Sequence, residues 1–278
     1  MNLEQRITEI SQNPPEEAPS DFRELFKSFL KALENGEIRS AQKADGRWVV
    51  NSWVKHGILL GFKYGQNRAF DREGSFKFFD KHTYPTQEID GVEKNIRIVP
   101  GGSTVRSGCY IGNNVTMMPP MYVNAGAYVD DNTMLDSHAL VGSCAQIGKR
   151  VHLSAGAQIG GVLEPIGALP VVVEDDCLVG GNTGIYEGTQ VGEGAVIGAG
   201  VVLTRSTPVY DLVHECVYRG SGGEPLKIPS QAVVVPGSRP IKNHKYAESI
   251  GLNISTPVII KYRDDKTDAA TTLENLLR

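Results

Sequence analysis

The feature that most limits how this chain can fold is an apolar residue that recurs at every sixth position. The series begins at Val99, continues without a break to Ile159, and resumes at Val173. Its members are Val99, Val105, Ile111, Met117, Val123, Val129, Leu135, Val141, Ile147, Leu153, Ile159, Val173, Val179, Ile185, Val191, Ile197, Leu203 and Val209. Only 40% of the residues are apolar, so chance does not account for the series.

Each repeat also contains a second position that is expected to face the core, and a turn. A small or apolar residue usually follows four positions after each start, as Cys109 does after Val105. Gly, Asn and Asp fill the places between, as in the segment 112–114, where tight turns need a positive φ. This period fits neither a helix nor an alternating hairpin strand, but it fits one flat face of a parallel β-helix. Three faces make one coil, which predicts about six coils that stand about 30 Å tall and bury one continuous core.

The residues before the repeat predict a small α-rich domain. Residues 21–33 place Phe and Leu on one side of a helix, which Asn35 and Gly36 are expected to end. Residues 47–63 predict a short strand and an apolar helix. We therefore expect an N-terminal domain at 1–96, followed by the β-helix at 97–235.

The residues after the repeat, 236–278, predict a cap. The expected elements here and just before are a Gly-rich loop at 217–225, a closing partial coil at 228–235, a strand at 256–262 and a helix at 268–277. Such pieces would cover the open end of a solenoid, whose exposed strand edges otherwise invite aggregation.

The repeat is interrupted once, in the segment 163–170. The step from Ile159 to Val173 is slightly longer than two repeats, so the prism is expected to bulge there. A loop that interrupts a rigid scaffold is a candidate cover for an active site, and a tolerated insertion is the alternative.

Charge and composition exclude several classes of function. Lys and Arg number 28 against 32 Asp and Glu, a formal net charge of -4, which argues against a nucleic-acid partner bound through its phosphates. The first ten residues lack the pattern of a secretory signal, and no run of about 18 apolar residues predicts a membrane span, so we expect a cytoplasmic protein. The four cysteines lie far apart without CxxC spacing, which favours reduced thiols over disulfides or a zinc site.

Beyond the repeat, the chain resembles the tetrahydrodipicolinate N-succinyltransferases along nearly its whole length. The resemblance is carried by the segment YVNAGAYVDDNTMLDSHALVGSCAQIGKRVHLSAGAQIGGVLEPIGALPVVVEDD at 122–176, RWVVNSWVKHGILL at 47–60, FFDK at 78–81, RIVPGGSTVR at 97–106 and ENLLR at the C-terminus. It implies a mainly β fold, a left-handed parallel β-helix of hexapeptide repeats. It also implies a homotrimer whose clefts between neighbouring prisms bind succinyl-CoA as co-substrate and the cyclic imine, without a permanently bound cofactor.

The resemblance implies roles for three residues in a reaction that needs a base, oxyanion donors and cations. Asp136 matches the family's substrate-contacting, catalytic Asp, and the alternative is a turn carboxylate that caps backbone amides. Arg97 matches an arginine that grips a substrate carboxylate in bidentate fashion, and the alternative is a solvated charge. Where the family has a further acid this chain has Gly184. Glu187, three residues later, matches a family glutamate and either takes over part of that role or is a surface carboxylate.

Other charged and metal-binding candidates remain open. Lys149, Arg150, Arg205, Arg219 and Lys227 are candidates for coenzyme A phosphates, and the sequence does not choose among them. His138 and His152 lie on the repeat without a third ligand, so no metal site is expected. Two alternative functions stay open: an acetyl- or other acyl-CoA transferase on a related amino acid, including a relative from toxin biosynthesis, and a non-catalytic β-solenoid binding protein.

Overall fold

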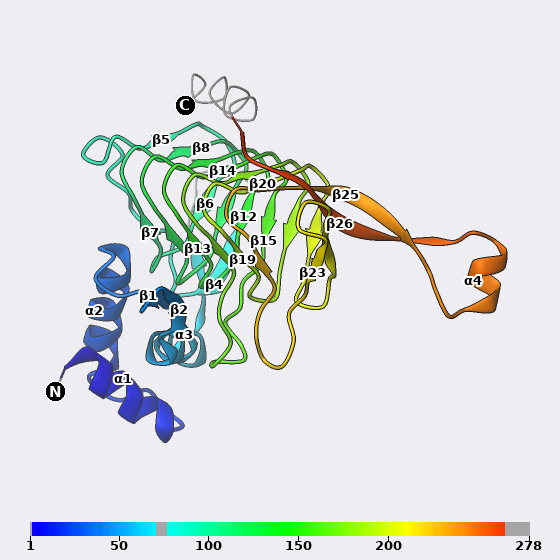
Figure 1. The fold of residues 1–278 in the computed structure, drawn as a ribbon. Helices are drawn as coiled ribbons and strands as arrows, with labels where there is room; N and C mark the ends of the chain where they lie inside the picture. The colour runs from blue at the N-terminus through cyan, green and yellow to red at the C-terminus, as the bar shows by residue number, and fades with distance from the viewer. Residues whose placement is uncertain (1, 71–76, 265–278) are drawn as a thin grey trace.

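Three parallel β-sheets wind around one apolar core and form the body of the protein (Figure 1). The computed structural model describes residues 2–70 and 77–264. Two-residue strands fall on the three sheets in turn, and each strand pairs with the strand one coil away. Met134, for example, pairs with His152 of the next coil. The second residue of nearly every strand is buried in the core, which confirms the predicted β-helix of hexapeptide repeats.

We call the three sheets face 1, face 2 and face 3, in the order in which the chain visits them. Face 1 contains β5 (Arg97–Ile98), β8 (Thr116–Met117), β11 (Met134–Leu135), β14 (His152–Leu153), β17 (Leu178–Val179) and β20 (Val196–Ile197). Face 2 contains β6 (Thr104–Val105), β9 (Tyr122–Val123), β12 (Leu140–Val141), β15 (Gln158–Ile159), β18 (Gly184–Ile185) and β21 (Val202–Leu203). Face 3 contains β7 (Tyr110–Ile111), β10 (Tyr128–Val129), β13 (Gln146–Ile147), β16 (Val172–Val173), β19 (Gln190–Val191) and β24 (Lys227–Ile228).

The two ends of the predicted series depart from the structure. Ile98 pairs with Met117, so the first strand ends one residue before the expected start at Val99. No earlier coil lies below this strand to impose the period. At the other end, Val209 is buried in the core, but its strand joins the sheet that extends face 1, and Ile228 takes the place beside Val191 on face 3.

The interruption is larger than the sequence suggested. The segment from Ile159 to Val173 replaces a single step of the repeat rather than two, because Ile147 pairs directly with Val173 across face 3. The coil that contains the loop runs from Ile159 to its partner Ile185 and is therefore longer than the coil before it, which runs from Val141 to Ile159. The additional residues form the expected bulge.

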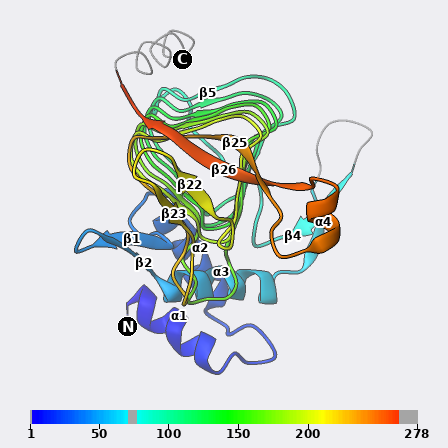
Figure 2. The same ribbon diagram turned by 45° about the vertical axis from the view of Figure 1, so that its right-hand side comes forward.

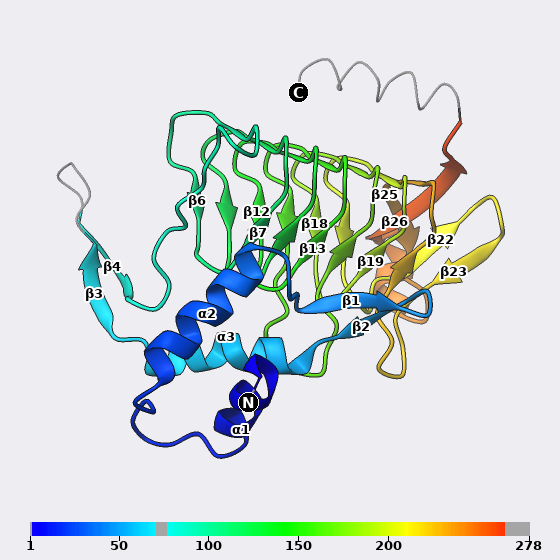
Figure 3. The ribbon, with the colours of Figure 1, turned by 90° about the vertical axis from the view of Figure 1, so that its left-hand side faces the viewer.

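The N-terminal region is helical, as expected, and packs against the corner between face 2 and face 3 (Figure 3). Ile58 contacts the turn at Gly126, and the Ser40 hydroxyl donates to the Cys144 carbonyl at 2.9 Å. Its elements are α1 (Leu3–Gln12), α2 (Phe22–Glu34), β1 (Ala41–Ala44), β2 (Arg47–Val50), α3 (Ser52–Tyr64), β3 (Asn67–Phe70) and β4 (Phe78–Lys81). None of the helices in the described residues is both long enough and apolar enough to cross a membrane.

The C-terminal segments extend face 1 into a ten-stranded sheet and carry an arm that projects beyond the last coil (Figure 2). They are β22 (Val209–Asp211), β23 (Cys216–Tyr218), β25 (Ala232–Pro240), α4 (Lys245–Ser249) and β26 (Asn253–Tyr262). The partial coil expected at 228–235 is present, since β24 and β25 stack on β19 and β20. The loop expected at 217–225 is shorter than expected, because its first two residues belong to β23. The helix expected at 268–277 lies outside the described residues.

Candidate functional site

Asp136 lies in the turn that follows β11, at the corner between face 1 and face 2. The backbone fixes this turn, because the Asp136 amide donates to the Leu153 carbonyl of the next coil at 2.9 Å. One side-chain oxygen, Oδ1, accepts a hydrogen bond from the Ser137 amide at 2.7 Å. The side chain is 29% exposed, so the carboxylate is supported by the turn and still open to a ligand.

A histidine from the neighbouring coil stands beside this carboxylate. Nε2 of His152 lies 4.0 Å from Oδ2 of Asp136, and the imidazole is largely buried. From the sequence, His152 is a candidate only as a metal ligand. The repeat holds the signal that would have found the pair, because His152 lies one full coil after Met134 and stacks on it, next to Asp136.

Arg97 lies on the same face as Asp136, two strands away. It is aligned with Thr116 on β8, which in turn is aligned with Met134 on β11. At about 4.8 Å between strands, this places the backbone of Arg97 about 10 Å from the strand that leads into Asp136. Arg97 is exposed, and its backbone amide donates to the Val115 carbonyl at 3.0 Å. The structure therefore brings an exposed guanidinium and a half-exposed carboxylate onto one outer surface.

Glu187 lies elsewhere in the chain, in the turn after β18 at the corner between face 2 and face 3. Its side chain is exposed, and Oε2 accepts a hydrogen bond from the Arg205 amide of the next coil at 3.1 Å. Asp136 and Glu187 thus stand at opposite edges of face 2. Within one chain the structure does not bring these two carboxylates together.

A tyrosine ring occupies the space beside Gly184. A Cβ added to Gly184 would overlap Cε2 of Tyr186 and lie 2.8 Å from its phenol oxygen, and one added to Gly160 would lie 2.8 Å from the same ring. The ring therefore covers Gly184 on β18 and Gly160, which directly follows β15, the adjacent strand of face 2. This contact gives a physical reason for the glycine at 184, since any side chain there competes with Tyr186 for the same volume.

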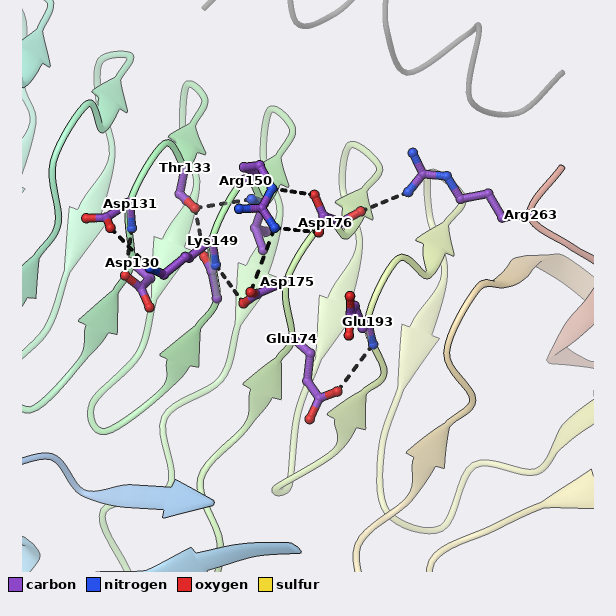
Figure 4. A network of polar contacts seen from close by, with 12 residues as sticks. Asp130, Asp131, Thr133, Lys149, Arg150, Glu174, Asp175, Asp176, Glu193 and Arg263 are labelled. Carbon is purple, nitrogen blue, oxygen red and sulfur yellow. Dashed lines mark hydrogen bonds and ion pairs between the residues drawn. The ribbon is translucent and has the colours of Figure 1, made fainter. Parts of the chain in front are cut away.

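The basic residues proposed for coenzyme phosphates differ in what they already bind. Figure 4 shows Lys149 and Arg150 in a ladder of charges at the corner between face 3 and face 1. The Lys149 ammonium lies 3.3 Å from Asp131, and the Arg150 guanidinium lies 2.6 Å from Asp176. These carboxylates already neutralise both cations.

Arg205 and Arg219 are placed differently from that ladder. The Gly220 amide donates to the Arg205 carbonyl at 2.9 Å, so the segment after β23 lies against the turn after β21. Neither side chain makes an ion pair or a hydrogen bond within residues 2–70 and 77–264. The hydroxyls of Thr204 and Thr207, 2.8 Å apart, lie in the same turn. The turn after β21 and the segment beside it thus present two exposed cations and two hydroxyl groups.

Three of the four cysteines are buried, and Cys216 is exposed. Cys109, Cys144 and Cys177 are buried, and burial raises the pKa of the Cys144 and Cys177 thiols to about 12, so neither is a thiolate nucleophile near neutral pH. In the part of the chain that the structure describes, no three His, Cys, Asp or Glu side chains form a group that could hold a metal ion.

Comparison with protein-family models identifies two segments. Residues 2–64 match the model described as the N-terminal region of tetrahydrodipicolinate N-succinyltransferase. Residues 170–205 match the model described as the hexapeptide repeat of succinyl-transferase. The matches fall on the helical region and on the coils after the interrupting loop.

Three bacterial relatives named 2,3,4,5-tetrahydropyridine-2,6-dicarboxylate N-succinyltransferase align over almost the full chain. The protein from Acinetobacter baylyi is 42% identical, with 99% of this chain and 97% of the relative covered. Those from Polynucleobacter asymbioticus and Idiomarina loihiensis are 40% and 39% identical, covering 99% and 100% of this chain and 97% and 98% of the relatives.

A solved structure supports the fold alone. It is described as a 2,3,4,5-tetrahydropyridine-2-carboxylate N-succinyltransferase from Campylobacter jejuni and is 18% identical, with a TM-score of 0.53. The alignment covers 85% of this chain, which spans only 62% of that longer protein.

Proposed function

The chain belongs to the tetrahydrodipicolinate N-succinyltransferase family, and from this premise we propose that it moves a succinyl group from succinyl-CoA to the amine of tetrahydrodipicolinate. The acceptor is the open form of the cyclic imine, 2-amino-6-oxopimelate. The products are N-succinyl-2-amino-6-oxopimelate and free coenzyme A, on the diaminopimelate route to lysine. The observation that carries the proposal is the placement of Arg97 and Asp136 on one outer face.

In the proposed chemistry, one residue accepts the proton of the attacking amine and another binds the negative charge of the acceptor. The amine nitrogen attacks the thioester carbonyl carbon, and Asp136 accepts the proton that the nitrogen loses. The imidazole of His152, beside Oδ2 of Asp136, stabilises or relays that proton. The carbon–sulfur bond then breaks, and the thiolate of coenzyme A leaves and takes up a proton. Arg97 holds a carboxylate of the acceptor through paired hydrogen bonds.

The proposed binding of the acyl donor uses the last turns of the corner between face 2 and face 3. Arg205 and Arg219 are the better candidates for its phosphates, because Lys149 and Arg150 are already paired with carboxylates. The donor is a co-substrate and leaves after each cycle. A cytoplasmic location follows for an enzyme that draws on succinyl-CoA.

A homotrimer is part of the proposal. Asp136 and Glu187 stand at opposite edges of face 2, so a cleft that uses both residues needs two chains. In a ring of three prisms, one edge of each chain faces the other edge of its neighbour, which creates three equal clefts.

A second candidate function has one specific observation in its favour. The Tyr186 ring fills the volume beside Gly184 where the family acid is expected, so this part of the site is smaller and uncharged. An acyl group that is shorter than succinyl and has no carboxylate, such as acetyl, would fit a smaller and uncharged site. Both candidates are acyl transfers and differ only in the donor.

One assay separates these functions. Purified protein is incubated with succinyl-CoA or acetyl-CoA and an aminopimelate-type amine, while the release of free thiol is followed. Release with succinyl-CoA supports the main proposal, and release with acetyl-CoA alone would replace it with the second candidate. No release with any donor would leave a β-solenoid binding protein.

A further inference from the structure

Lys55 is the only buried lysine in the described part of the chain, with 0% of its surface exposed. It lies on the inner side of α3, between the buried Val54 and Ile58. A lysine in such a place is rare, because burying an ammonium costs free energy unless a partner compensates it.

The partner of Lys55 belongs to the loop that interrupts the coil. Its ammonium donates to the Ala168 carbonyl at 2.5 Å, and this is its one hydrogen bond within residues 2–70 and 77–264. No carboxylate among these residues forms an ion pair with it, and burial lowers the pKa of Lys55.

The rest of the loop is held mainly at its two ends. Near the start, the Val162 amide donates to the Ser143 carbonyl at 3.2 Å, and the Val162 side chain is buried in the β-helix core. Near the end, Pro170 is buried, while residues 164 and 165 at the tip are exposed. The N-terminal region thus contacts the loop on both sides of its tip: Leu163 packs against the N-terminal apolar core, and Lys55 binds the Ala168 carbonyl.

The loop shares its corner with the turns that we assign to the acyl donor. The corner between face 2 and face 3 carries, in successive coils, this loop, the Tyr186 turn and the Arg205 turn. The loop touches the middle turn, because a Cβ added to Gly188 would lie 2.6 Å from the Leu169 carbonyl oxygen. A donor bound by its phosphates at Arg205 and extended along this corner would meet the loop.

We propose that Lys55 is a positioning residue for acyl transfer: it holds the loop at Ala168 against the corner, and the loop in this place borders the acyl-donor site. The inference rests on the proposed function for the identity of the donor. Because Lys55 is buried beneath α3 and binds the Ala168 carbonyl, the position of α3 and the position of the loop depend on each other. In this way α3 influences the shape of the donor site without contacting the donor.

The test replaces Lys55 by Met, which keeps the length and apolar stem of the side chain but cannot donate a hydrogen bond. The control is Lys63→Met on the same helix, where the side chain is exposed. Hydrogen exchange of the amides at 160–171, the melting temperature, and the KM values for acyl-CoA and for the amine are measured for each protein.

We expect Lys55→Met to exchange the loop amides about tenfold faster and to raise the KM for acyl-CoA about tenfold, or about 1.4 kcal/mol. The KM for the amine and kcat should stay within about twofold. The melting temperature should stay equal or rise, because a buried charge without a counter-ion has been removed. Lys63→Met should match the parent throughout.

Two results would overturn the inference, and a third would overturn the proposed function on which it rests. Unchanged loop exchange and KM in Lys55→Met would show that Lys55 does not hold the loop. A lower melting temperature with faster exchange along the whole chain, or a failure to fold, would make Lys55 a purely structural residue. If the parent protein releases no thiol from any donor, the proposed function fails, while the loop exchange still tests the contact between Lys55 and Ala168.

Discussion

Oδ2 of Asp136 lies 4.0 Å from Nε2 of His152 on the neighbouring coil, while Oδ1 of the same carboxylate accepts a hydrogen bond from its own turn. The turn therefore occupies Oδ1, whereas Oδ2 is the oxygen that the proposed proton transfer would use. A substitution that keeps the turn hydrogen bond and removes the charge distinguishes capping from catalysis.

Asp136→Asn is expected to lower kcat by about 10² to 10⁴, the usual effect of removing a general base. The Asn side-chain oxygen can still accept the Ser137 amide, so folding should persist. The measurement is kcat at matched folded concentration, with circular dichroism to check the fold. Asp130→Asn is the matched control, because Oδ1 of Asp130 accepts the Asp131 amide at 2.9 Å in a similar turn. Turnover of Asp136→Asn within threefold of the parent would move the role to Glu187 or to a substrate carboxylate.

Arg97→Ala is expected to raise the KM for the dicarboxylate acceptor by about ten- to a hundredfold, because a charge-assisted contact is worth about 1.5–3 kcal/mol. The KM for acyl-CoA should hardly change. Initial rates at varied concentrations of each substrate give both values, and Arg47→Ala, in the exposed strand β2, is the control. Equal losses for both substrates would mean that Arg97 supports the fold.

Gly184→Glu is expected to lower the free energy of unfolding by about 1–3 kcal/mol, because its Cβ would overlap the Tyr186 ring. Adding Tyr186→Ala removes the overlap and should recover much of that loss. Urea denaturation of the parent, both single variants and the double variant measures the coupling. If Gly184→Glu is as stable as the parent, the ring does not enforce the glycine.

Asp211 should make stability depend on pH in acid. Burial alone would raise its pKa, but hydrogen bonds from Tyr262, His214 and two backbone amides lower it to about 2, below the ordinary 3.8. A lowered pKa stabilises the fold above about pH 4, and this contribution, about 1–2 kcal/mol, is lost as the pH falls toward 2. Urea denaturation should show the loss between these pH values in the parent and in Asp45→Asn, an exposed control, but not in Asp211→Asn. The same acid response in Asp211→Asn would contradict the assignment.

Light scattering is expected to give a particle of about 90 kDa, three times the 30.1 kDa chain. The expectation follows from the placement of Asp136 and Glu187 at opposite edges of face 2. A stable monomer with full activity would refute it.

The sequence predicted the fold wherever local period and global packing agree. Every expected repeat position from Val105 to Leu203 is buried, because an inward side chain at each step is the condition for stacking. Val99 is not a strand residue, and Val209 is buried as expected but does not stack on the previous coil, because no further coil enforces the period at either end of the prism. The prediction also misjudged the step from Ile159 to Val173, since length alone does not tell how many faces a loop crosses.

Less of the candidate site than of the fold could be predicted from the sequence. The resemblance pointed to Asp136, but the neighbour His152 follows only from the register between coils. The departure at Gly184 was visible in the sequence, whereas its cause, the ring of Tyr186 folded back over the strand, is a side-chain conformation that no spacing encodes. The partners of Lys149, Arg150 and Lys55 likewise depend on contacts between distant segments.

The stacking of each residue on its counterpart one coil later has a consequence for how genes of this kind change in length. Inserting or deleting a single hexapeptide within the coils would rotate every later segment onto the next face and carry each downstream turn to another corner. An insertion or deletion leaves the downstream turns at their original corners only if it adds or removes one whole coil. Smaller insertions and deletions should therefore collect in the loop after β15 and in the arm formed by β25 and β26, where the chain has left the stack.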